Sequence, residues 1–432
     1  MTKSFDSKSK VSKSLAVALV KDGEPFPVFC APFALRIGNL AQSLGERGHR
    51  VTWHASNFLH YRREFTTELA VNSKPDQKYL IALHRAGAYY KNISPARWLH
   101  HLRLAFATFW TLLREPELDV IHCCVPTLES ATVCWLVARL RNVPLILDVR
   151  DPWPEVFVHS APPKLKKLVR GLLRPYFALA QALFRKADSL TAVSFSFLHW
   201  AQELSGRSTL AQERDRVFFL GSHDLLEGAS GERSFSQEDS DLIKIVYIGG
   251  FSSIYEFETL RQALIDGLGD SPDFSFLLIG EGGDGYESLK SSLEGFQNVE
   301  FTGWLSRERA YSLALDCDVG LVPLRSELEG FLPNKPFEYA SLGLPLLSSA
   351  RGEVQSFVER TECGWFYETG DSKSLTERLL ALKREPHLVR EASRRARAFW
   401  ESEGHALKLA ERLADHVEMV AASRECYADS SR

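Results

Sequence analysis

Residues 333–347 read PNKPFEYASLGLPLL, and this stretch decides the fold of the second half of the chain. It opens with polar residues, continues as a short helical segment, turns at Gly343 and Pro345 and re-enters an apolar run, as in an α/β domain. Lys335 and Glu338 are three residues apart and share one helix face. Backbone N–H groups at a helix start favour an anion. The stretch predicts a diphosphate site beside Lys335 and a sugar-hydroxyl contact at Glu338, with a plain surface ion pair as the alternative.

The residues before this stretch form apolar, strand-like runs that end in glycine turns. One run leads into Gly249 and Gly250, and the next leads into a turn that carries Glu281. Glycine lets the backbone approach a phosphate closely, and it also serves an ordinary tight turn, so both interpretations stay open. Strands are predicted at 243–248, 274–279, 299–303 and 319–323.

The first half of the chain shows the same alternation of strands and helices. A helix is predicted at 35–45, and a long helical region at 164–186. This alternation is typical of doubly wound parallel sheets, which bind ligands beyond the carboxyl ends of their strands. The fold class is therefore α/β, with two tandem Rossmann-like doubly wound domains and an inter-domain cleft. Strands of the first half are predicted at 15–20, 50–54, 79–83, 120–123, 144–149 and 189–194, the last of this half.

Composition shifts along the chain indicate the domain boundaries. Residues 1–14 are rich in serine and lysine without an apolar run, which predicts a disordered tail and no secretory signal. Residues 15–225 form the first domain, and the polar stretch 226–241 is predicted to be a linker. Residues 242–395 form the second domain, and helices at about 396–420 are predicted to pack back on the first.

The composition is typical of a soluble globular protein, with 45% hydrophobic and 25% charged residues. A formal net charge of −3 gives no sign of a nucleic-acid partner. The 7 cysteines include no CxxC pair and no zinc-like spacing, so we expect buried reduced thiols, no metal and a cytoplasmic location. No apolar run approaches the roughly 18 residues of a membrane span, which favours a soluble or peripheral protein.

The loop after the predicted strand 144–149 is the densest polar loop of the first half. Arg150 and Asp151 follow the strand end directly, and a proline-stiffened turn then carries Trp153, which we expect to be exposed. Such a loop can hold catalytic groups, and the Arg–Asp pair can equally be a strand-end ion pair. Glu24 lies in the turn after the first strand, where it contacts sugar hydroxyls or only shapes the turn.

These motifs resemble the retaining glycosyltransferases of family 4, in particular the bacterial surface-polysaccharide branch, over about residues 15–415. The resemblance rests on Pro-Asn-Lys, Phe-Glu-Tyr and Gly-x-Pro within 333–347, and on Arg-Asp-x-Trp-Pro from Arg150 to Pro154. It implies a GT-B fold, a nucleotide-diphosphate sugar as donor, a glycan or polyprenyl-linked sugar as acceptor and no cofactor. It also implies transfer with retention of configuration, in polysaccharide or glycolipid biosynthesis.

The resemblance assigns roles to the candidate residues. Residues 15–225 become the acceptor-side domain, and residues 242–395 become the nucleotide-sugar-binding domain. The catalytic candidates are Arg150, Asp151 and Lys335. The acceptor-side candidates are Glu24 and Trp153. The donor-binding candidates are Gly249, Gly250, Glu281, Asn334, Lys335 and Glu338.

The chain also departs from the family pattern. The family has a histidine near the position of Arg150, and this histidine is absent here. Gly250 and Tyr255 stand where the family has an arginine and a lysine, and Gly330 replaces the first of its two glutamates. Lys335 is expected to compensate, with Arg325 or Arg351 as helpers. The losses also admit an inactive nucleotide-sugar-binding relative, and a sugar-nucleotide epimerase of the same fold is a further alternative.

A basic, leucine-rich segment offers a contact with a membrane. Between Lys164 and Arg174, five cations alternate with four leucines and a valine. A solvated helix packed on a core explains this pattern, and so does a helix that lies on an anionic bilayer. The second interpretation places the protein in the cytoplasm, at the inner face of the plasma membrane, where a lipid-linked acceptor would be found.

Overall fold

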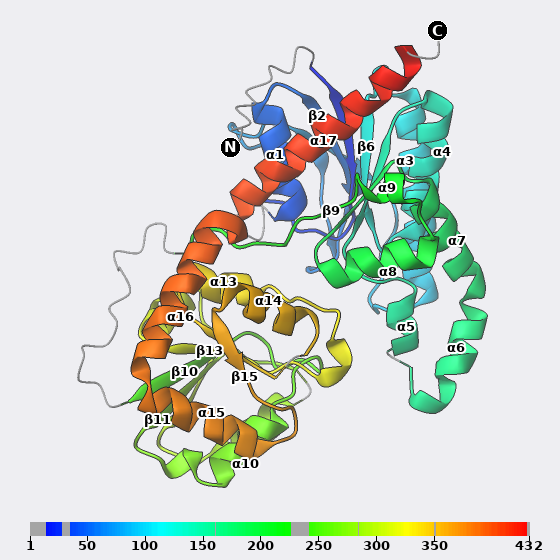
Figure 1. Cartoon of the computed structure of the whole chain (residues 1–432). Coiled ribbons are helices and arrows are strands. Elements are labelled where there is room, and N and C mark those ends of the chain that lie inside the picture. The colour runs from blue at the N-terminus through cyan, green and yellow to red at the C-terminus, as the bar shows by residue number, and fades with distance from the viewer. Residues whose placement is uncertain are drawn as a thin grey trace. The chain divides into compact units, whose positions relative to one another are not determined.

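The computed structural model describes residues 14–27, 35–159, 161–225, 242–283, 285–349 and 351–429. The chain divides into two compact units (Figure 1). The first unit comprises residues 1–193, 197–218 and 410–432, and the second comprises 194–196 and 219–409. The predicted linker 226–241 lies outside the described residues, as does the predicted tail except for Ser14.

The first unit contains a parallel sheet in the order β5-β2-β1-β6-β7-β8-β9. Its central strands β1, β6 and β7 are buried along their whole length, which is typical of parallel strands covered on both faces. A separate hairpin, β3–β4, follows β2. The strands are β1 (Ala16–Val20), β2 (Arg50–Ser56), β3 (Phe58–Leu59), β4 (Glu64–Phe65), β5 (Leu80–His84), β6 (Val120–Val125), β7 (Leu145–Val149), β8 (Ser189–Ala192) and β9 (Arg216–Val217).

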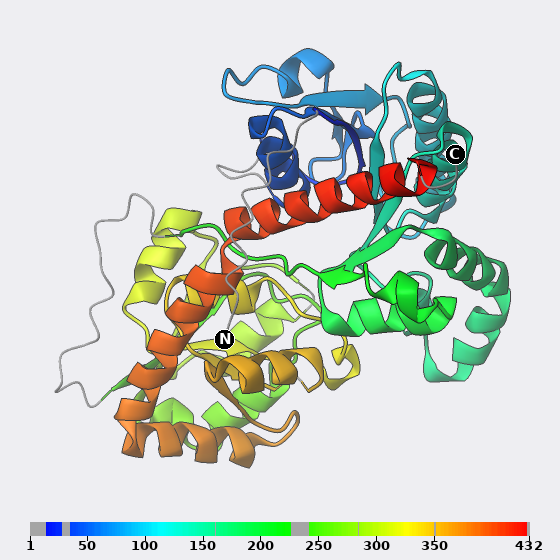
Figure 2. The ribbon, with the colours of Figure 1, turned by 45° about the horizontal axis from the view of Figure 1, so that its top comes forward.

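Helices cover both faces of this sheet. The apolar side chains of α1 and of the second part of α17 share one core with β1, β2 and β6, and Figure 2 shows α17 lying along the sheet. On the other face α3 packs against α4, and α4 packs against α7. The helices are α1 (Arg36–Glu46), α2 (Glu68–Val71), α3 (Pro95–Arg114), α4 (Leu128–Arg141), α5 (Glu155–His159), α6 (Lys166–Leu172), α7 (Arg174–Lys186), α8 (Phe195–Ser205) and α9 (Thr209–Gln212), with a 3₁₀ turn at Pro163–Leu165.

The second unit contains a parallel sheet in the order β12-β11-β10-β13-β14-β15. One core joins β10, β11 and β13 to the apolar faces of α10, α11 and α15. The strands are β10 (Ile243–Ile248), β11 (Phe274–Ile279), β12 (Val299–Gly303), β13 (Val319–Val322), β14 (Leu346–Ser348) and β15 (Gly364–Phe366).

The helices of the second unit alternate with its strands, and the last helix leaves it. α17 begins in the second unit and enters the first after Leu409, whereas the sequence prediction set the return at about residue 396. The helices are α10 (Glu258–Ile265), α11 (Tyr286–Leu293), α12 (Arg307–Leu315), α13 (Lys335–Ser341), α14 (Glu353–Thr361), α15 (Ser372–Arg384), α16 (Pro386–Phe399) and α17 (Ala406–Asp429). Short turns lie at Leu268–Asp270, Ser326–Leu328 and Trp400–Gly404.

The predicted α/β class with two parallel-sheet domains is confirmed, and one local prediction is wrong. The strand at 189–194 is not the last of its half, because the two-residue strand β9 pairs with β8. The region 164–186 is helical as predicted, and it is divided at Leu173 between α6 and α7. Pro175 fits there, in the first turn of α7, where its missing N–H costs no hydrogen bond.

Candidate functional site

Lys335 is the first residue of α13, and its side chain is buried at the carboxyl end of β10. Only 7% of the residue is exposed. Its ammonium group lies 4.5 Å from the ring centre of Tyr247 and 5.0 Å from that of Tyr255, and it donates a hydrogen bond to the carbonyl of Ile248. Aromatic rings attract a cation through their faces. Tyr255 stands at a position where the family has a lysine. In this chain its ring contacts the ammonium of Lys335, which comes from α13.

Gly249 leaves the space that the Lys335 ammonium fills. A Cβ atom built on Gly249 would lie 2.3 Å from Lys335 Nζ, and the residue has φ +138°. A side chain at this position would therefore displace the ammonium as well as strain the backbone. The structure brings together these two predicted donor residues, which sequence analysis placed on separate segments.

Tyr339 fixes α13 to the sheet beneath it. Its hydroxyl accepts a hydrogen bond from Ile248 N at 3.0 Å and lies 3.3 Å from the carbonyl oxygen of Leu321. Its ring lies over Gly320, where a Cβ atom would come within 2.4 Å of the ring. The position of Lys335 relative to β10 thus depends on a tyrosine that is itself fully buried.

Burial lowers the pKa of Lys335 from 10.5 to about 8, and the negative charge of Glu338 partly opposes this shift. Glu338 is half-buried, and among the described residues its carboxylate has neither a hydrogen-bond partner nor an ion-pair partner within 4.0 Å. Lys335 likewise forms no ion pair within that part of the chain. A cation without an ion-pair partner and a carboxylate without a hydrogen-bond partner can both contact a ligand.

The remaining donor-side candidates occupy the loops around this cluster. Asn334 is exposed, and its carbonyl accepts hydrogen bonds from two N–H groups of the first turn of α13. Gly250 accepts a hydrogen bond from the Tyr247 hydroxyl at 2.6 Å. Glu281 is exposed, and a Cβ atom on Gly303 would lie 3.7 Å from its carboxylate.

The two expected helper cations have partners of their own. Arg325 Nε donates a hydrogen bond to the carbonyl of Ser253 at 2.6 Å. Arg351 forms an exposed ion pair with Glu368 at 2.6 Å. Neither contact involves Lys335, and the expectation that they help it stays a prediction.

In the first unit, Glu24 ties the loop after β1 to two other elements. Its Oε1 accepts hydrogen bonds from Ile37 N at 2.8 Å and Gly38 N at 3.3 Å, in the first turn of α1. Its Oε2 pairs with Arg150 at 2.7 Å. Both oxygens are engaged by protein donors, which favours the turn-shaping interpretation of Glu24. The contact between Glu24 and an acceptor stays a prediction.

A second ion pair lies deeper in the sheet, between Arg36 and Asp148. Two guanidinium nitrogens of Arg36 donate to Asp148 at 2.8 and 3.1 Å, and the hydroxyl of Thr191 donates to Asp148 at 2.7 Å. Burial alone would raise the pKa of Asp148, but the nearby Arg36 holds it well below its usual range. The sequence analysis did not predict this pair, because its partners lie on α1 and β7.

Asp151 and Trp153 follow Arg150 in the loop after β7. Burial raises the pKa of Asp151, against the opposing charges of Lys21, Arg150 and Arg97. Its carboxylate accepts no hydrogen bond from the described residues. Trp153 is half-buried, whereas we expected it to be exposed, because Phe157 packs on it at 4.6 Å and the Arg97 guanidinium lies 5.8 Å from its ring centre.

A pocket opens between the loop after β1 and the β3–β4 hairpin. It encloses about 350 Å³, part of which is open to solvent. His100 helps to fix one wall, since its Nε2 lies 2.9 Å from Asp22 Oδ2. Sequence analysis missed this pocket because the hairpin strands are only two residues long. The lining residues are Asp22, Gly23, Glu24, Pro25, Phe26, Ser56, Phe58, Leu59, His60, Tyr61 and Arg62.

The described residues contain no group of three or more His, Cys, Asp or Glu side chains that could hold a metal ion. An Asp-x-Asp sequence does occur at Asp316 and Asp318. Asp318 lies just before β13, where it accepts a hydrogen bond from Lys244 N at 2.9 Å, at the sheet edge opposite Lys335. No helix in the described ranges is long and apolar enough to cross a membrane.

Two family models match the chain, one in each unit. A glycosyl transferase 4-like domain matches residues 34–210, and the domain described as glycosyl transferases group 1 matches residues 243–385. No curated protein matches the chain significantly in sequence.

Solved structures resemble the chain over nearly its whole length. Sucrose-phosphate synthase from Thermosynechococcus elongatus is 16% identical with a TM-score of 0.69, and the match covers 95% of this chain and 100% of that one. HepE from Anabaena, solved in complex with UDP, is 14% identical with a TM-score of 0.62 and covers 93% and 99%. WaaG, a glycosyltransferase involved in lipopolysaccharide biosynthesis, is 16% identical with a TM-score of 0.57 and also covers 93% and 99%. By both of its domains, the chain therefore belongs to the glycosyltransferases of the GT-B fold.

Proposed function

We propose that this protein transfers a sugar, with retention of anomeric configuration, from a nucleotide-diphosphate sugar to a glycan or polyprenyl-linked sugar acceptor. The observation that carries the proposal is the buried Lys335 ammonium, which lies over two tyrosine rings beside Gly249 without an ion-pair partner among the described residues. Burying a cation is costly unless an anion compensates it. A diphosphate at this place supplies the compensating charge.

The chemistry of the donor site follows from these groups. As the bond between sugar and diphosphate breaks, negative charge grows on the leaving oxygen, and a fixed cation stabilises that charge. Lys335 supplies the cation, and the N–H group of Gly250 supplies a short-range donor, whereas the N–H of Gly249 already donates to the carbonyl of Ile279 at 2.8 Å. Glu338, one turn further along α13, accepts hydrogen bonds from hydroxyls of the transferred sugar. Asn334 and Glu281 border the same site.

The acceptor-side residues act on the other substrate. The leaving phosphate takes the proton of the acceptor hydroxyl in a front-face reaction, so the protein needs no strong base. Asp151 orients that hydroxyl, because its carboxylate is half-buried and has no hydrogen-bond partner among the described residues. Arg150 positions the loop through its ion pair with Glu24, and Trp153 offers an aromatic surface to the acceptor sugar. We propose that no metal or other cofactor takes part.

We place the enzyme in polysaccharide or glycolipid biosynthesis of a bacterial cell surface. The resemblance of its Pro-Asn-Lys and Arg-Asp-x-Trp-Pro motifs to that branch supports this role. The structural likeness to WaaG is consistent with it. HepE structures that hold UDP and UDP-glucose make uridine diphosphate sugars the first donors to try.

A donor panel tests the proposal. The purified protein is incubated with uridine, guanosine and adenosine diphosphate sugars, and nucleotide release and sugar products are followed by chromatography. Release of nucleoside diphosphate with one donor, and an α-linked product from an α-linked donor, supports retaining transfer. An isomerised sugar nucleotide would show an epimerase. Binding of a donor without turnover under any condition would show an inactive relative.

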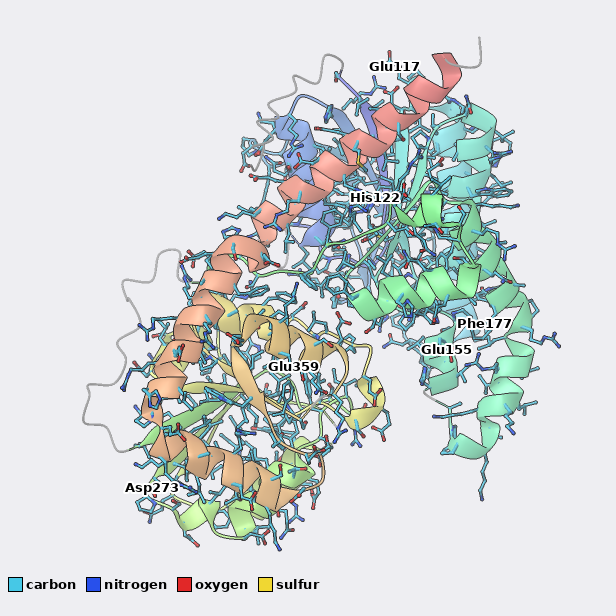
Figure 3. All side chains as sticks on the ribbon, in the orientation of Figure 1. Glu117, His122, Glu155, Phe177, Asp273 and Glu359 are labelled. Carbon is cyan, nitrogen blue, oxygen red and sulfur yellow. The ribbon has the colours of Figure 1, made fainter. Side chains whose placement is uncertain are left out.

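We also propose that the enzyme works in the cytoplasm at the inner face of the plasma membrane, through the segment from Lys164 to Arg174. No residue of α6 is buried, and its leucines Leu168 and Leu172 are exposed to solvent. This favours the membrane interpretation over a helix packed on a core. Arg170 is engaged by Glu155 and lies 5.2 Å from the ring centre of Phe177; Figure 3 labels these two partners on α5 and α7.

A further inference from the structure

The exposed side of α3 carries a row of large apolar residues. Trp98, Leu102, Phe106 and Trp110 are spaced four residues apart and therefore form one stripe on the helix, which we call the α3 stripe. Their exposed fractions are 52%, 37%, 66% and 39%. From the first to the last residue the stripe runs about 18 Å along the helix axis. Soluble monomers rarely leave so continuous an apolar surface in water.

The opposite side of α3 is less apolar than the side that faces water. The buried residues of this helix include His100, His101 and Thr108 along with Leu104 and Leu112. An ordinary surface helix places its polar residues outside. In α3 polar residues are buried and large apolar residues are exposed. Its outer side therefore suits an apolar environment better than water.

The charges of α3 select the kind of partner. The helix contains no Asp or Glu, and its charged residues are Arg97, Arg103 and Arg114. The guanidinium of Arg114 lies 5.1 Å from the ring centre of Trp110, at the end of the stripe. If two copies met through this helix, the arginines of both would approach one another with no acid on the helix to pair with. An anionic membrane offers acyl chains to the stripe and phosphates to the arginines.

Other exposed apolar groups of the first unit come just before the stripe in the sequence. Tyr90 and Ile93, in the loop before α3, are 74% and 76% exposed. At the start of the stripe Trp98 donates a hydrogen bond to the hydroxyl of Tyr176 at 3.0 Å, in the first turn of α7 just after α6. Tryptophan, with an apolar ring and one N–H donor, suits the boundary between headgroups and acyl chains.

The stripe also begins next to the acceptor-side residues. Arg97, the residue before Trp98, lies 5.5 Å from the ring centre of Tyr89 and 5.8 Å from that of Trp153. A membrane in contact with the stripe would therefore lie beside the loop that carries Asp151. A sugar attached to a lipid would reach this loop without leaving the membrane surface.

We infer that the α3 stripe inserts into the boundary between headgroups and acyl chains of an anionic membrane, so that the acceptor is a sugar on a membrane lipid. This inference rests on the proposed transferase and extends its membrane contact from the cations of α6 to an apolar face. The two contacts differ in their response to salt. Attraction of the α6 cations is screened, because the Debye length falls from about 10 Å at 0.1 M to about 3 Å at 1 M. Apolar insertion persists at high salt.

Vesicle flotation tests the inference, with vesicles of phosphatidylglycerol and phosphatidylcholine in equal parts. The variant Phe106→Ser/Trp110→Ser removes the centre and end of the stripe. The control Leu69→Ser/Leu210→Ser removes two leucines that are 84% and 74% exposed in the same unit outside the stripe. We expect wild type and control to float at both salt concentrations. The bound fraction of the stripe variant should be about tenfold lower than that of wild type at low salt, and the variant should not bind at high salt.

Two results would overturn the inference: a stripe variant that floats like wild type, or a wild type that is a dimer in solution while the stripe variant is a monomer. The second result, read by light scattering, would assign the stripe to a protein interface. Nucleotide release from donor sugar without vesicles serves as the check of folding, and the stripe variant should retain it. If wild type binds vesicles but releases nucleotide from no donor, the proposed transferase fails and the membrane contact stands.

Discussion

The two sheets of this protein treat buried charge in opposite ways at their carboxyl edges. In the first unit two buried ion pairs lie at this edge, Arg36 with Asp148 and Glu24 with Arg150. In the second unit the buried cation Lys335 lies over two tyrosine rings and pairs with no carboxylate among the described residues. The fold is the same, but these two pairs are already neutralised and Lys335 is not.

This difference separates charges that hold loops from charges that bind ligands. A paired buried ion has its compensation inside the protein, and removing one partner leaves the other uncompensated. An unpaired buried cation costs stability until an anion arrives, and this cost favours binding. We therefore expect substitutions at the paired charges to affect folding first, and substitutions at Lys335 to affect the donor first.

The largest effect is expected for Asp148→Asn. The substitution leaves Arg36 buried without its charge partner, which should lower the free energy of unfolding by about 3–5 kcal/mol. Urea unfolding followed by circular dichroism measures it. The control is Glu117→Gln, because the ion pair of Glu117 with Arg50 is exposed and should contribute at most about 1 kcal/mol. Equal losses of unfolding free energy in the two variants would show that the buried ion pair contributes no more to stability than the exposed one.

Lys335→Ala and Glu338→Ala should each lower activity roughly ten- to a hundredfold, because charge-assisted hydrogen bonds contribute about 1.5–3 kcal/mol. Steady-state assays with the best donor of the panel measure this effect. Neither variant should unfold more easily than wild type, and Lys335→Met should be at least as stable, since burial of the ammonium is unfavourable. Wild-type rates in both alanine variants would contradict the assignment of the donor site to α13.

Asp151→Asn should reduce turnover about tenfold while nucleotide affinity stays nearly normal, because Asp151 belongs to the first unit and is proposed to contact the acceptor. Calorimetry with the nucleotide and assays with saturating donor separate the two quantities. The control is Asp188→Asn, which lies before β8 and whose Oδ2 accepts from Leu145 N. A loss of nucleotide binding in a folded Asp151→Asn protein would place this loop in the donor pocket instead.

The smallest expected effect is that of pH on donor affinity. The pKa of Lys335 is about 8 in the folded protein, so its ammonium is mostly protonated at pH 7 and mostly neutral at pH 9. Affinity for the diphosphate should fall by at most about tenfold between these values. Lys335→Arg should bind with no such dependence. Because the folded pKa is below the unfolded value of 10.5, stability should rise with pH between about 8 and 10.5.

Most of the fold could be predicted from the sequence because parallel strands covered on both faces are continuous apolar runs. The strands at 243–248 and 274–279 were predicted with their observed bounds. Shorter elements escaped, since β9 and the β3–β4 hairpin span two residues each and depend on pairing with distant segments. The turn at Leu173 was hidden in a pattern that is helical on both sides.

The site could be predicted where its residues are close in sequence, and not where they meet across elements. Lys335 and Glu338 lie on one short helix, and their common face follows from spacing alone. The rings of Tyr247 and Tyr255 come from β10 and the loop after it, and only the fold brings them to Lys335. The ion pair of Arg36 with Asp148 has the same origin.

Gly320 has a consequence for how this sequence can change through evolution. It touches no proposed ligand, yet a Cβ atom there would collide with the Tyr339 ring, which anchors the helix that begins with Lys335. Positions 320 and 339 should therefore be inherited as a pair, with larger residues at 320 appearing only in relatives that have lost the tyrosine. In such relatives we would expect the lysine of the donor site at a position other than 335. Gly320 takes no part in the chemistry of the donor site, yet the side chain allowed at this strand position limits which sequences can keep that site.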